Sequence, residues 1–270
     1  MICFPNAKIN LGLSIIRKRP DNYHDIETIF YPIDITDALE IVPASKDGGT
    51  FIQTGDSLSC DAENNLVIKA YRLLQYRVPL PEIEIYLRKY IPSGAGLGGG
   101  SSDAAHMLKL LNQYANLKIN DSDLESIASE IGSDCPFFIQ NRPVFAEGKG
   151  NVFSNIELSL NGYFLILISP AIHVSTKEAY SLITPQFPKY KITEVINSPI
   201  SEWKNMLIND FEKSVFPQYP ELGTIKNKLY EYGAIYVSMS GSGSSIFGIF
   251  DHKIDLAKEF YPEKVYLIPL

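Results

Sequence analysis

The chain is poor in cysteine and histidine and has no long apolar run, and each scarcity excludes a class of protein. Its three cysteines (Cys3, Cys60 and Cys135) form an odd, scattered set, so we expect reduced thiols and a cytoplasmic location rather than a disulfide framework. There is no Cys-x-x-Cys pair and no cluster of the four histidines, so no structural metal site is predicted. No apolar stretch approaches the roughly 20 residues that span a bilayer, and the first residues lack the pattern of a secretory signal.

Positive charge is also scarce. The chain has 24 Lys and Arg against 31 Asp and Glu, a formal net charge of −7 at pH 7. A nucleic-acid binder usually displays a basic face, so we expect neither a nucleic-acid nor a membrane partner. The short basic run Arg17-Lys18-Arg19 fits a solvated turn and a phosphate-facing segment equally well. An anionic ligand would have to be attracted locally, by amides, lysines and a divalent cation.

The remaining composition is that of an ordinary globular protein, with 45% apolar and 20% charged residues in 270. The pattern predicts strands at 7–16 and 26–42, with Asn22 in the turn between them, and a helix at 65–76. Ser122-x-x-Glu125 predicts a capping box for a helix that ends at Gly132, with Pro136 opposing a restart. After a turn at 148–150 we expect strands at 163–169, 234–239, 245–250 and 264–268, and helices from Ser175, at 221–232 and at 254–260. This is a mixed α+β pattern without strict alternation, with domains expected at 1–150 and 151–270.

The segment from Ile91 to Ala105 is the most informative of the chain. It holds five glycines and then Ser101-Ser102-Asp103. An alternating strand precedes it (Ile83, Ile85, Leu87), and a helical stripe follows it (Ala104, Met107, Leu108, Leu111). A glycine loop before a helix presents backbone N–H groups at the positive end of the helix dipole, which favours phosphate. Neither the Walker lysine nor the Rossmann spacing is present.

Three further segments contain candidate functional residues. Lys8 and Asn10 share one face of a predicted strand, either as functional groups or as the polar face of an edge strand. Asp134 stands before a Pro-Phe-Phe run, where it fits a catalytic base or a solvated turn residue, and Cys135 beside it fits packing. The segment Met239–Ser245 is either a hairpin turn or a second backbone cradle for a ligand.

Together these segments resemble the superfamily of galactokinase, homoserine kinase, mevalonate kinase and phosphomevalonate kinase, the GHMP kinases. Pro92–Ser102 matches the superfamily's phosphate loop with one extra glycine. Within the superfamily, Arg19-Pro20-Asp21-Asn22-Tyr23-His24 is most similar to the branch that acts on 4-diphosphocytidyl-2-C-methyl-D-erythritol. In that branch a glycine usually stands in place of Asn22, and asparagine accommodates the same left-handed turn.

The resemblance implies a two-domain α+β fold: an ATP-binding N-terminal domain like domain 2 of ribosomal protein S5, and a ferredoxin-like C-terminal domain on the substrate side. It implies transfer of the γ-phosphoryl group of ATP, with Mg²⁺, to the 2-hydroxyl of that small-molecule substrate in the non-mevalonate route to isoprenoid precursors. It also implies a monomer or homodimer.

The resemblance assigns roles to individual residues as well. Asp134 matches the catalytic aspartate and Lys8 its lysine partner. Asn10, Tyr23 and His24 match the cytidine and substrate pocket, and Tyr180 its second stacking aromatic. Asn65 and Lys89 align with adenine and ribose contacts. The metal ligands stay open between Ser101, Ser102 and Asp103. The remaining nucleotide contacts fall on the phosphate loop: Pro92, Gly94, Ala95, Gly96, Leu97, Gly98, Gly99, Gly100, Ser101 and Ser102.

Two alternatives are carried forward. One is a different small-molecule kinase of the superfamily, specific for homoserine or mevalonate; such kinases lack the Arg-Pro-Asp-x-Tyr-His segment. The other is a catalytically silent relative that binds nucleotide without turnover, which loss of the acid or the lysine would indicate. Both Asp134 and Lys8 are present.

Overall fold

The computed structural model describes residues 1–45, 49–55 and 62–270, and Cys60 lies outside them. Contacts between residues divide the chain into two compact units. Unit 1 contains Met1–Lys8, Asp34–Ser93 and Gly98–Arg142, and unit 2 contains Ile9–Ile33, Gly94–Leu97 and Pro143–Leu270. The expected boundary at residue 150 falls inside unit 2 and stays a prediction about the two domains. Among the described residues, no helix is both long and apolar enough to cross a membrane.

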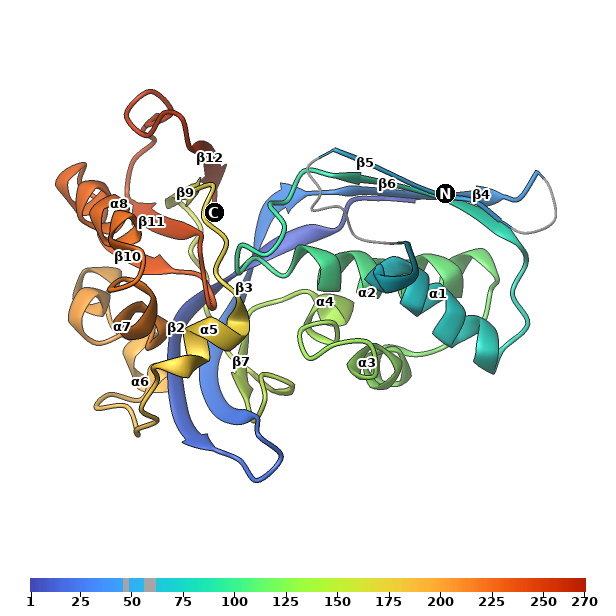
Figure 1. Ribbon diagram of the computed structural model, residues 1–270, viewed down its shortest axis with the longest axis horizontal. Helices are drawn as coiled ribbons and strands as arrows, with labels where there is room; N and C mark the ends of the chain where they lie inside the picture. The colour runs from blue at the N-terminus through green and yellow to red at the C-terminus, as the bar shows by residue number, and fades with distance from the viewer. Residues whose placement is uncertain (46–48, 56–61) are drawn as a thin grey trace. The chain divides into compact units, whose positions relative to one another are not determined.

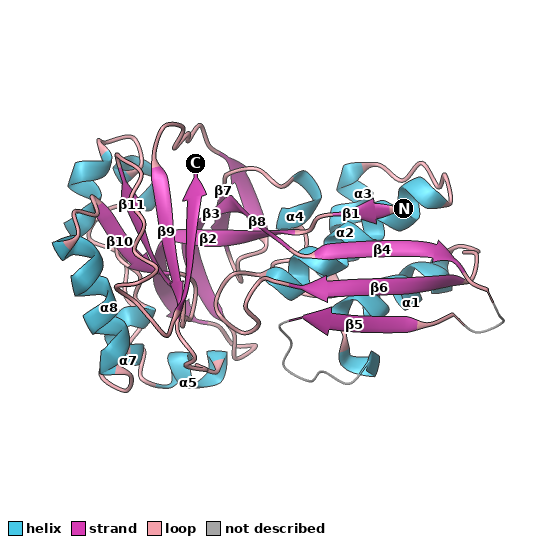
Figure 2. Cartoon of the chain, turned by 90° about the horizontal axis from the view of Figure 1, so that it is seen from above, coloured by secondary structure: helices cyan, strands magenta, loops and turns pink. Residues whose placement is uncertain are grey.

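The sheet of unit 1 has the strand order β1-β4-β6-β5. Its strands are β1 (Ile2–Cys3), β4 (Ala38–Pro43), β6 (Ile83–Lys89) and β5 (Phe51–Gly55). The first three pair antiparallel, and β5 pairs parallel with β6. Figure 2 shows β4, β6 and β5 side by side. Ile83, Ile85 and Leu87 are buried at alternate positions, which confirms the predicted strand before the glycine loop.

The helices of unit 1 are η1 (Ala62–Asn64), α1 (Leu66–Arg77), α2 (Gly99–Tyr114), α3 (Asp121–Ser129) and α4 (Phe137–Gln140). Helices α1 and α2 pack against each other under the sheet (Figure 1). The helix expected at 65–76 is confirmed as α1, with Asn65 as its N-cap.

Two expectations about helix ends in unit 1 are wrong. Helix α3 begins before Ser122, because the side chain of Asn120 accepts the N–H of Asp123 and caps the helix there. The short helix α4 follows directly after Pro136, which is its N-cap, so the missing N–H of the proline removes no hydrogen bond from within the helix.

A second sheet has the order β2-β3-β7-β8. Its strands are β2 (Asn6–Lys18), β3 (His24–Thr36), β7 (Val144–Glu147) and β8 (Val152–Asn155). The β2–β3 turn contains Asn22 at φ +65°, as predicted. The single strand expected at 26–42 is wrong. The chain leaves β3 at Asp37 and enters another sheet as β4, because the Asp37 carboxylate accepts the N–H groups of Tyr90 and Ile91.

The third sheet, in unit 2, is antiparallel with the order β10-β11-β9-β12. Its strands are β9 (Phe164–Ser169), β10 (Tyr236–Met239), β11 (Ile246–Phe250) and β12 (Lys264–Pro269), and helix α8 (Pro220–Glu231) packs on β10 and β11 (Figure 1). The other helices are α5 (Thr176–Ser181), α6 (Ile192–Val195), η2 (Ile200–Asn205) and α7 (Phe211–Val215). These elements confirm the α+β class.

One predicted helix of unit 2 is absent. Residues 254–256 are irregular and residues 257–260 form a turn, so there is no helix here. The side chain of Asp255 accepts the N–H of Ala257, a local bond that competes with helical pairing.

Candidate active site

The first group of candidate residues lies in unit 1, where Lys8 of β2 meets Asp134 in the loop between α3 and α4. The Lys8 Nζ lies 3.7 Å from the Asp134 Oδ2. The lysine side chain is only 5% exposed and the carboxylate 35%, so the pair has one buried end and one end open to solvent. Burial lowers the pKa of Lys8, and Asp134 opposes that shift. Lys8 is therefore not on the solvated face of an edge strand, and a shifted lysine beside an accessible acid is a functional-site signature.

The start of α2 lies against the same lysine. A Cβ placed at Gly98 would be 3.2 Å from Cε of Lys8 and 3.0 Å from Cζ of Phe138. Gly98 is the N-cap of α2 at φ +70°, and its end of the helix has no side-chain cap. The first N–H groups of a helix have no intrahelical partner, so here they are positioned for an anion next to the ammonium of Lys8.

Ser101 and Cys135 link the first turn of α2 to the Asp134 loop. The Ser101 side chain hydrogen-bonds the Cys135 thiol, and burial raises the pKa of that thiol to about 12. Cys135 is fully buried and protonated at neutral pH, as expected for a packing residue. Ser102 is also buried: its N–H donates to the carbonyl of the N-cap Gly98, and its hydroxyl lies 3.3 Å from the His106 Nδ1. Its side chain is thus not presented to a ligand.

In unit 2, the turn between β10 and β11 supports the glycine loop. The Ser240 hydroxyl donates to the Gly96 carbonyl at 2.8 Å, and the Ser245 N–H donates to the Ala95 carbonyl at 3.3 Å. A Cβ at Gly96, which has φ +78°, would lie 2.0 Å from the Ser240 carbonyl oxygen. Only glycine fits here. Met239–Ser245 is therefore a turn that holds the loop from behind.

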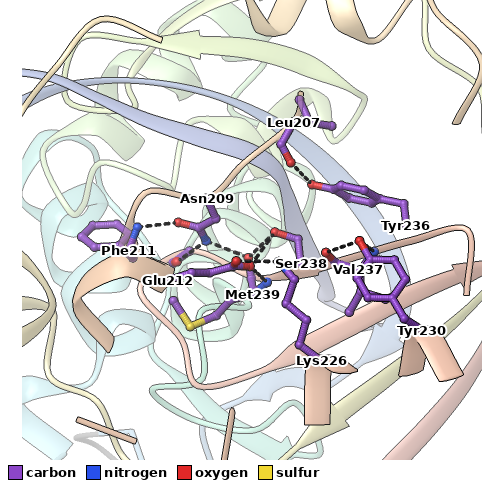
Figure 3. A network of polar contacts seen from close by, with 11 residues as sticks. Leu207, Asn209, Phe211, Glu212, Lys226, Tyr230, Tyr236, Val237, Ser238 and Met239 are labelled. Atoms are coloured by element: carbon purple, nitrogen blue, oxygen red, sulfur yellow. Dashed lines mark hydrogen bonds and ion pairs between the residues drawn. The ribbon is translucent and has the colours of Figure 1, made fainter. Parts of the chain in front are cut away.

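A polar network fixes this turn (Figure 3). The Asn209 amide donates to the carbonyls of Met239 and Gly241 at 2.7 and 2.8 Å. Glu212 accepts the Met239 N–H at 2.9 Å and pairs with Lys226. Asn209 is fully buried and Glu212 nearly so, which makes the geometry of the turn rigid.

The residues expected to recognise a base lie in unit 2. Asn10 is buried, and its amide donates to the Thr28 hydroxyl at 3.0 Å. Tyr23 is 57% exposed at the tip of the β2–β3 hairpin, with the Lys149 Nζ 4.5 Å from its ring centroid. His24 stacks on Tyr180 of α5, with ring centroids 4.5 Å apart and planes at 11°. Burial lowers the pKa of His24, which is therefore neutral at pH 7.

Two residues aligned with adenine and ribose contacts have internal partners in the structure. Asn65 caps α1 through its oxygen and donates to Gln53 at 2.7 Å. Lys89 is buried between the carboxylates of Asp37 and Asp103. Their contacts with a nucleotide stay predictions.

Comparison with known proteins decides the family. Residues 65–142 match the family description "GHMP kinases N terminal domain", and residues 196–266 match "GHMP kinases C terminal". The 4-diphosphocytidyl-2-C-methyl-D-erythritol kinase of Parabacteroides distasonis is 58% identical over 251 residues, 93% of this chain and 92% of that one. The kinase of the same name from Bacteroides fragilis is 56% identical over 260 residues, 96% and 95% of the two chains. The chain belongs to the 4-diphosphocytidyl-2-C-methyl-D-erythritol kinase family.

A solved structure agrees with this membership. A crystal structure of a 4-(cytidine 5'-diphospho)-2C-methyl-D-erythritol kinase superposes with a TM-score of 0.77 at 30% identity, covering 92% of this chain and 89% of that one. The resemblance inferred from the motifs is thereby confirmed, and with it the GHMP kinase fold.

Sequence reasoning missed Asp37, which in this kinase supports the site from a distance. Asp37 is buried and accepts two N–H groups ahead of the glycine loop, from residues 53 and 54 positions away, so no local spacing indicates its role. Asn209 and Glu212, which hold the turn behind the loop, lie in Asn209-Asp210-Phe211-Glu212, a further segment that resembles this kinase family.

Proposed function

We propose that this kinase transfers the γ-phosphoryl group of ATP to the 2-hydroxyl of 4-diphosphocytidyl-2-C-methyl-D-erythritol, giving ADP and the 2-phosphate in the non-mevalonate route to isoprenoid precursors. The observation that carries the proposal is the Lys8–Asp134 pair beside the uncapped start of α2. The pair occurs in a chain that is 58% identical to the 4-diphosphocytidyl-2-C-methyl-D-erythritol kinase of Parabacteroides distasonis.

The chemistry follows from the placement of these groups. Asp134 has an accessible carboxylate that can orient the acceptor hydroxyl and take its proton as the oxygen attacks phosphorus. Lys8 supplies a buried positive charge next to that carboxylate and offsets charge on the transferred group. Phosphoryl transfer depends mainly on positioning and charge stabilisation, so an acid, a lysine and a loop of amides account for the protein's part.

The residues fit ATP and Mg²⁺ as the phosphate donor and metal. Gly94, Gly96 and Gly98 alternate along the loop in left-handed backbone conformations, and such conformations can turn backbone N–H groups toward a phosphate. Mg²⁺ is usually held by one or two protein oxygens and by phosphates, and it neutralises phosphate charge when bound. Among the three oxygen side chains after the loop, Ser102 and Asp103 are buried and Ser101 is half-buried. We therefore propose Ser101 as the metal ligand.

Cytidine recognition is proposed for Asn10, Tyr23, His24 and Tyr180. The exposed ring of Tyr23 offers a stacking face, and a neutral His24 has one donor and one acceptor nitrogen for the edge of cytosine. Tyr180 already carries a stacked ring in this structure, that of His24.

Further expectations are retained as proposals. Residues 1–150 would form the ATP-binding domain and residues 151–270 the domain on the substrate side. A cytoplasmic location is supported by Cys3 and Cys135, which are free thiols. The assembly is proposed as a monomer or homodimer, with no nucleic-acid or membrane partner.

One assay tests the proposal. The purified chain is incubated with ATP, Mg²⁺ and the diphosphocytidyl substrate, and ADP release is coupled to a spectroscopic readout while the product is examined by phosphorus NMR. A phosphomonoester on the 2-carbon is expected. Phosphorylation of homoserine or mevalonate instead would favour the alternative kinases, and ATP binding without ADP release would favour the silent relative.

A further inference from the structure

Three charged side chains are buried together in unit 1, away from the Lys8–Asp134 pair. Lys89 ends β6, Asp103 lies in the second turn of α2, and Asp37 lies between β3 and β4. The Lys89 Nζ is 2.5 Å from the Asp103 Oδ2, and it also contacts the Asp37 Oδ2. The three side chains are 5%, 3% and 0% exposed. We call this group the clasp.

The clasp closes the glycine loop at its base. Lys89 and Asp103 bracket residues 90–102, so their ion pair joins the two ends of the segment that contains the loop. The Asp37 carboxylate also accepts the N–H groups of Tyr90 and Ile91, at 2.5 and 2.9 Å, on the side where the chain enters the loop. On the other side, a Cβ at Gly99 would lie 3.4 Å from the Lys89 Nζ. Both ends of the loop are thus held to one ammonium group.

The clasp also reaches the strand that carries Lys8. The backbone N–H of Asp37 donates to the Pro5 carbonyl at 2.8 Å, three residues before Lys8. One buried group therefore fixes the start of β2, the end of β6 and the first turns of α2.

Stability alone does not account for such a group. In the part of the chain that the structure describes, the Asp103 Oδ1 has no hydrogen-bond partner. Apolar side chains of similar volume often replace buried ion pairs without loss of stability, so a charged cluster here indicates a requirement for defined geometry.

We propose that the clasp is a positioning device that sets the backbone of the glycine loop for the phosphates of ATP. This inference rests on the proposed kinase function.

The test uses a double variant that removes both charges of the loop closure, Lys89→Met with Asp103→Leu, in the full chain. The double variant is built on Asp37→Asn, whose amide oxygen can still accept the N–H groups of Tyr90 and Ile91, so no buried charge is left without a counter-charge. We expect a thermal midpoint close to that of the wild type. The Kd for a non-hydrolysable ATP analogue with Mg²⁺, measured by calorimetry, should rise roughly 10- to 100-fold, the range for displaced positioning groups. The KM for the diphosphocytidyl substrate should change much less.

A matched control separates positioning from stability. Leu111→Ala opens a cavity under the far end of the same helix, at a fully buried position. It should lower the thermal midpoint and leave the Kd for the ATP analogue unchanged. Lys89→Arg, which keeps the charge, should retain most of the wild-type affinity for the ATP analogue.

The outcomes distinguish the two proposals. If the double variant folds and binds the ATP analogue as tightly as the wild type, the clasp is merely structural and the inference is overturned. If the double variant does not fold, Asp103→Asn decides in the same way, because it keeps the shape of the side chain and removes its charge. If the wild type itself neither binds the ATP analogue nor releases ADP, the proposed kinase function fails instead.

Discussion

Asp134 tests the proposed chemistry at the scale of a single residue. Asp134→Asn keeps the size of the side chain and removes its negative charge. If the carboxylate takes the hydroxyl proton, kcat should fall by roughly 10²–10⁴, the usual range for a positioned acid–base group. The Kd values for ATP and substrate should change little, because the loss is confined to the transition state. Steady-state kinetics measures kcat, and calorimetry on the same preparation measures the two Kd values. Near-normal turnover would remove Asp134 from the mechanism.

Lys8 gives a prediction about pH. Burial lowers its pKa below the usual 10.5, so the protonated form is lost at a lower pH than for an ordinary lysine. Activity should therefore fall as pH rises through that lowered pKa, and be fully retained below it. The profile of kcat/KM against pH should show this basic limb. Lys8→Met should be poorly active and lack the limb. A wild-type profile that stays flat up to pH 10.5 would contradict the assignment.

Sequence parity predicted that Lys8 and Asn10 share a face of the strand, and the structure adds that both side chains are buried. Parity could not show this, because burial depends on residues distant in the sequence, such as Gly98 beside Lys8 and Thr28 beside Asn10.

The glycine loop gives a prediction at the scale of an element. Gly98→Ala forces an alanine to φ +70° and places its Cβ 3.0 Å from Phe138. The left-handed conformation alone costs about 1–2 kcal/mol, and relief of the contact would displace Lys8 or the loop. We expect a lower thermal midpoint and a raised KM for ATP.

Gly100 provides the contrast within the same loop. It is helical without a positive φ, and a Cβ there would only touch Leu66 at 3.7 Å. Gly100→Ala should raise stability by about 0.5–1 kcal/mol, since alanine is the better helix former, and should retain ATP affinity. Equal KM values for ATP in the two variants would show that loop conformation does not govern nucleotide binding.

Elements with strong periodicity, such as α1 and β6, were predictable, whereas those decided by one side chain were not. Asn120 caps α3 in place of the predicted capping box at Ser122. In the segment predicted as a helix at 254–260, the Asp255 side chain accepts a backbone N–H instead. In both places a short polar side chain competes for a backbone N–H, and sequence spacing does not show which competitor succeeds.

Substrate choice is a property of the whole molecule. The proposed pocket predicts that the substrate must carry cytosine, since a uracil analogue would leave donors and acceptors unpaired. Each unpaired buried group costs about 1–3 kcal/mol, so kcat/KM should fall roughly 10- to 100-fold for the uridine analogue. Competition between the two analogues in one reaction, followed by mass spectrometry, measures the ratio. Equal turnover would discard Tyr23 and His24 as the recognition pair.

The family and the candidate residues of the site followed from short sequence motifs, but the contacts that hold these residues in place did not. In the sequence Asp37 looks like an ordinary strand residue. Its part in the clasp is visible only in the folded chain, where Lys89 pairs with both Asp37 and Asp103.

The spacing of the clasp also bears on how the chain acquires its structure. Lys89 and Asp103 are 14 positions apart, so closing their loop has a small entropic cost and can happen early, as soon as β6 and α2 form. Lys8 and Asp134 stand almost half the chain apart, and their encounter must wait until most of unit 1 has collapsed. A refolding chain should thus regain protected amides in the nucleotide loop before it regains turnover. Pulsed hydrogen exchange can resolve this order of events.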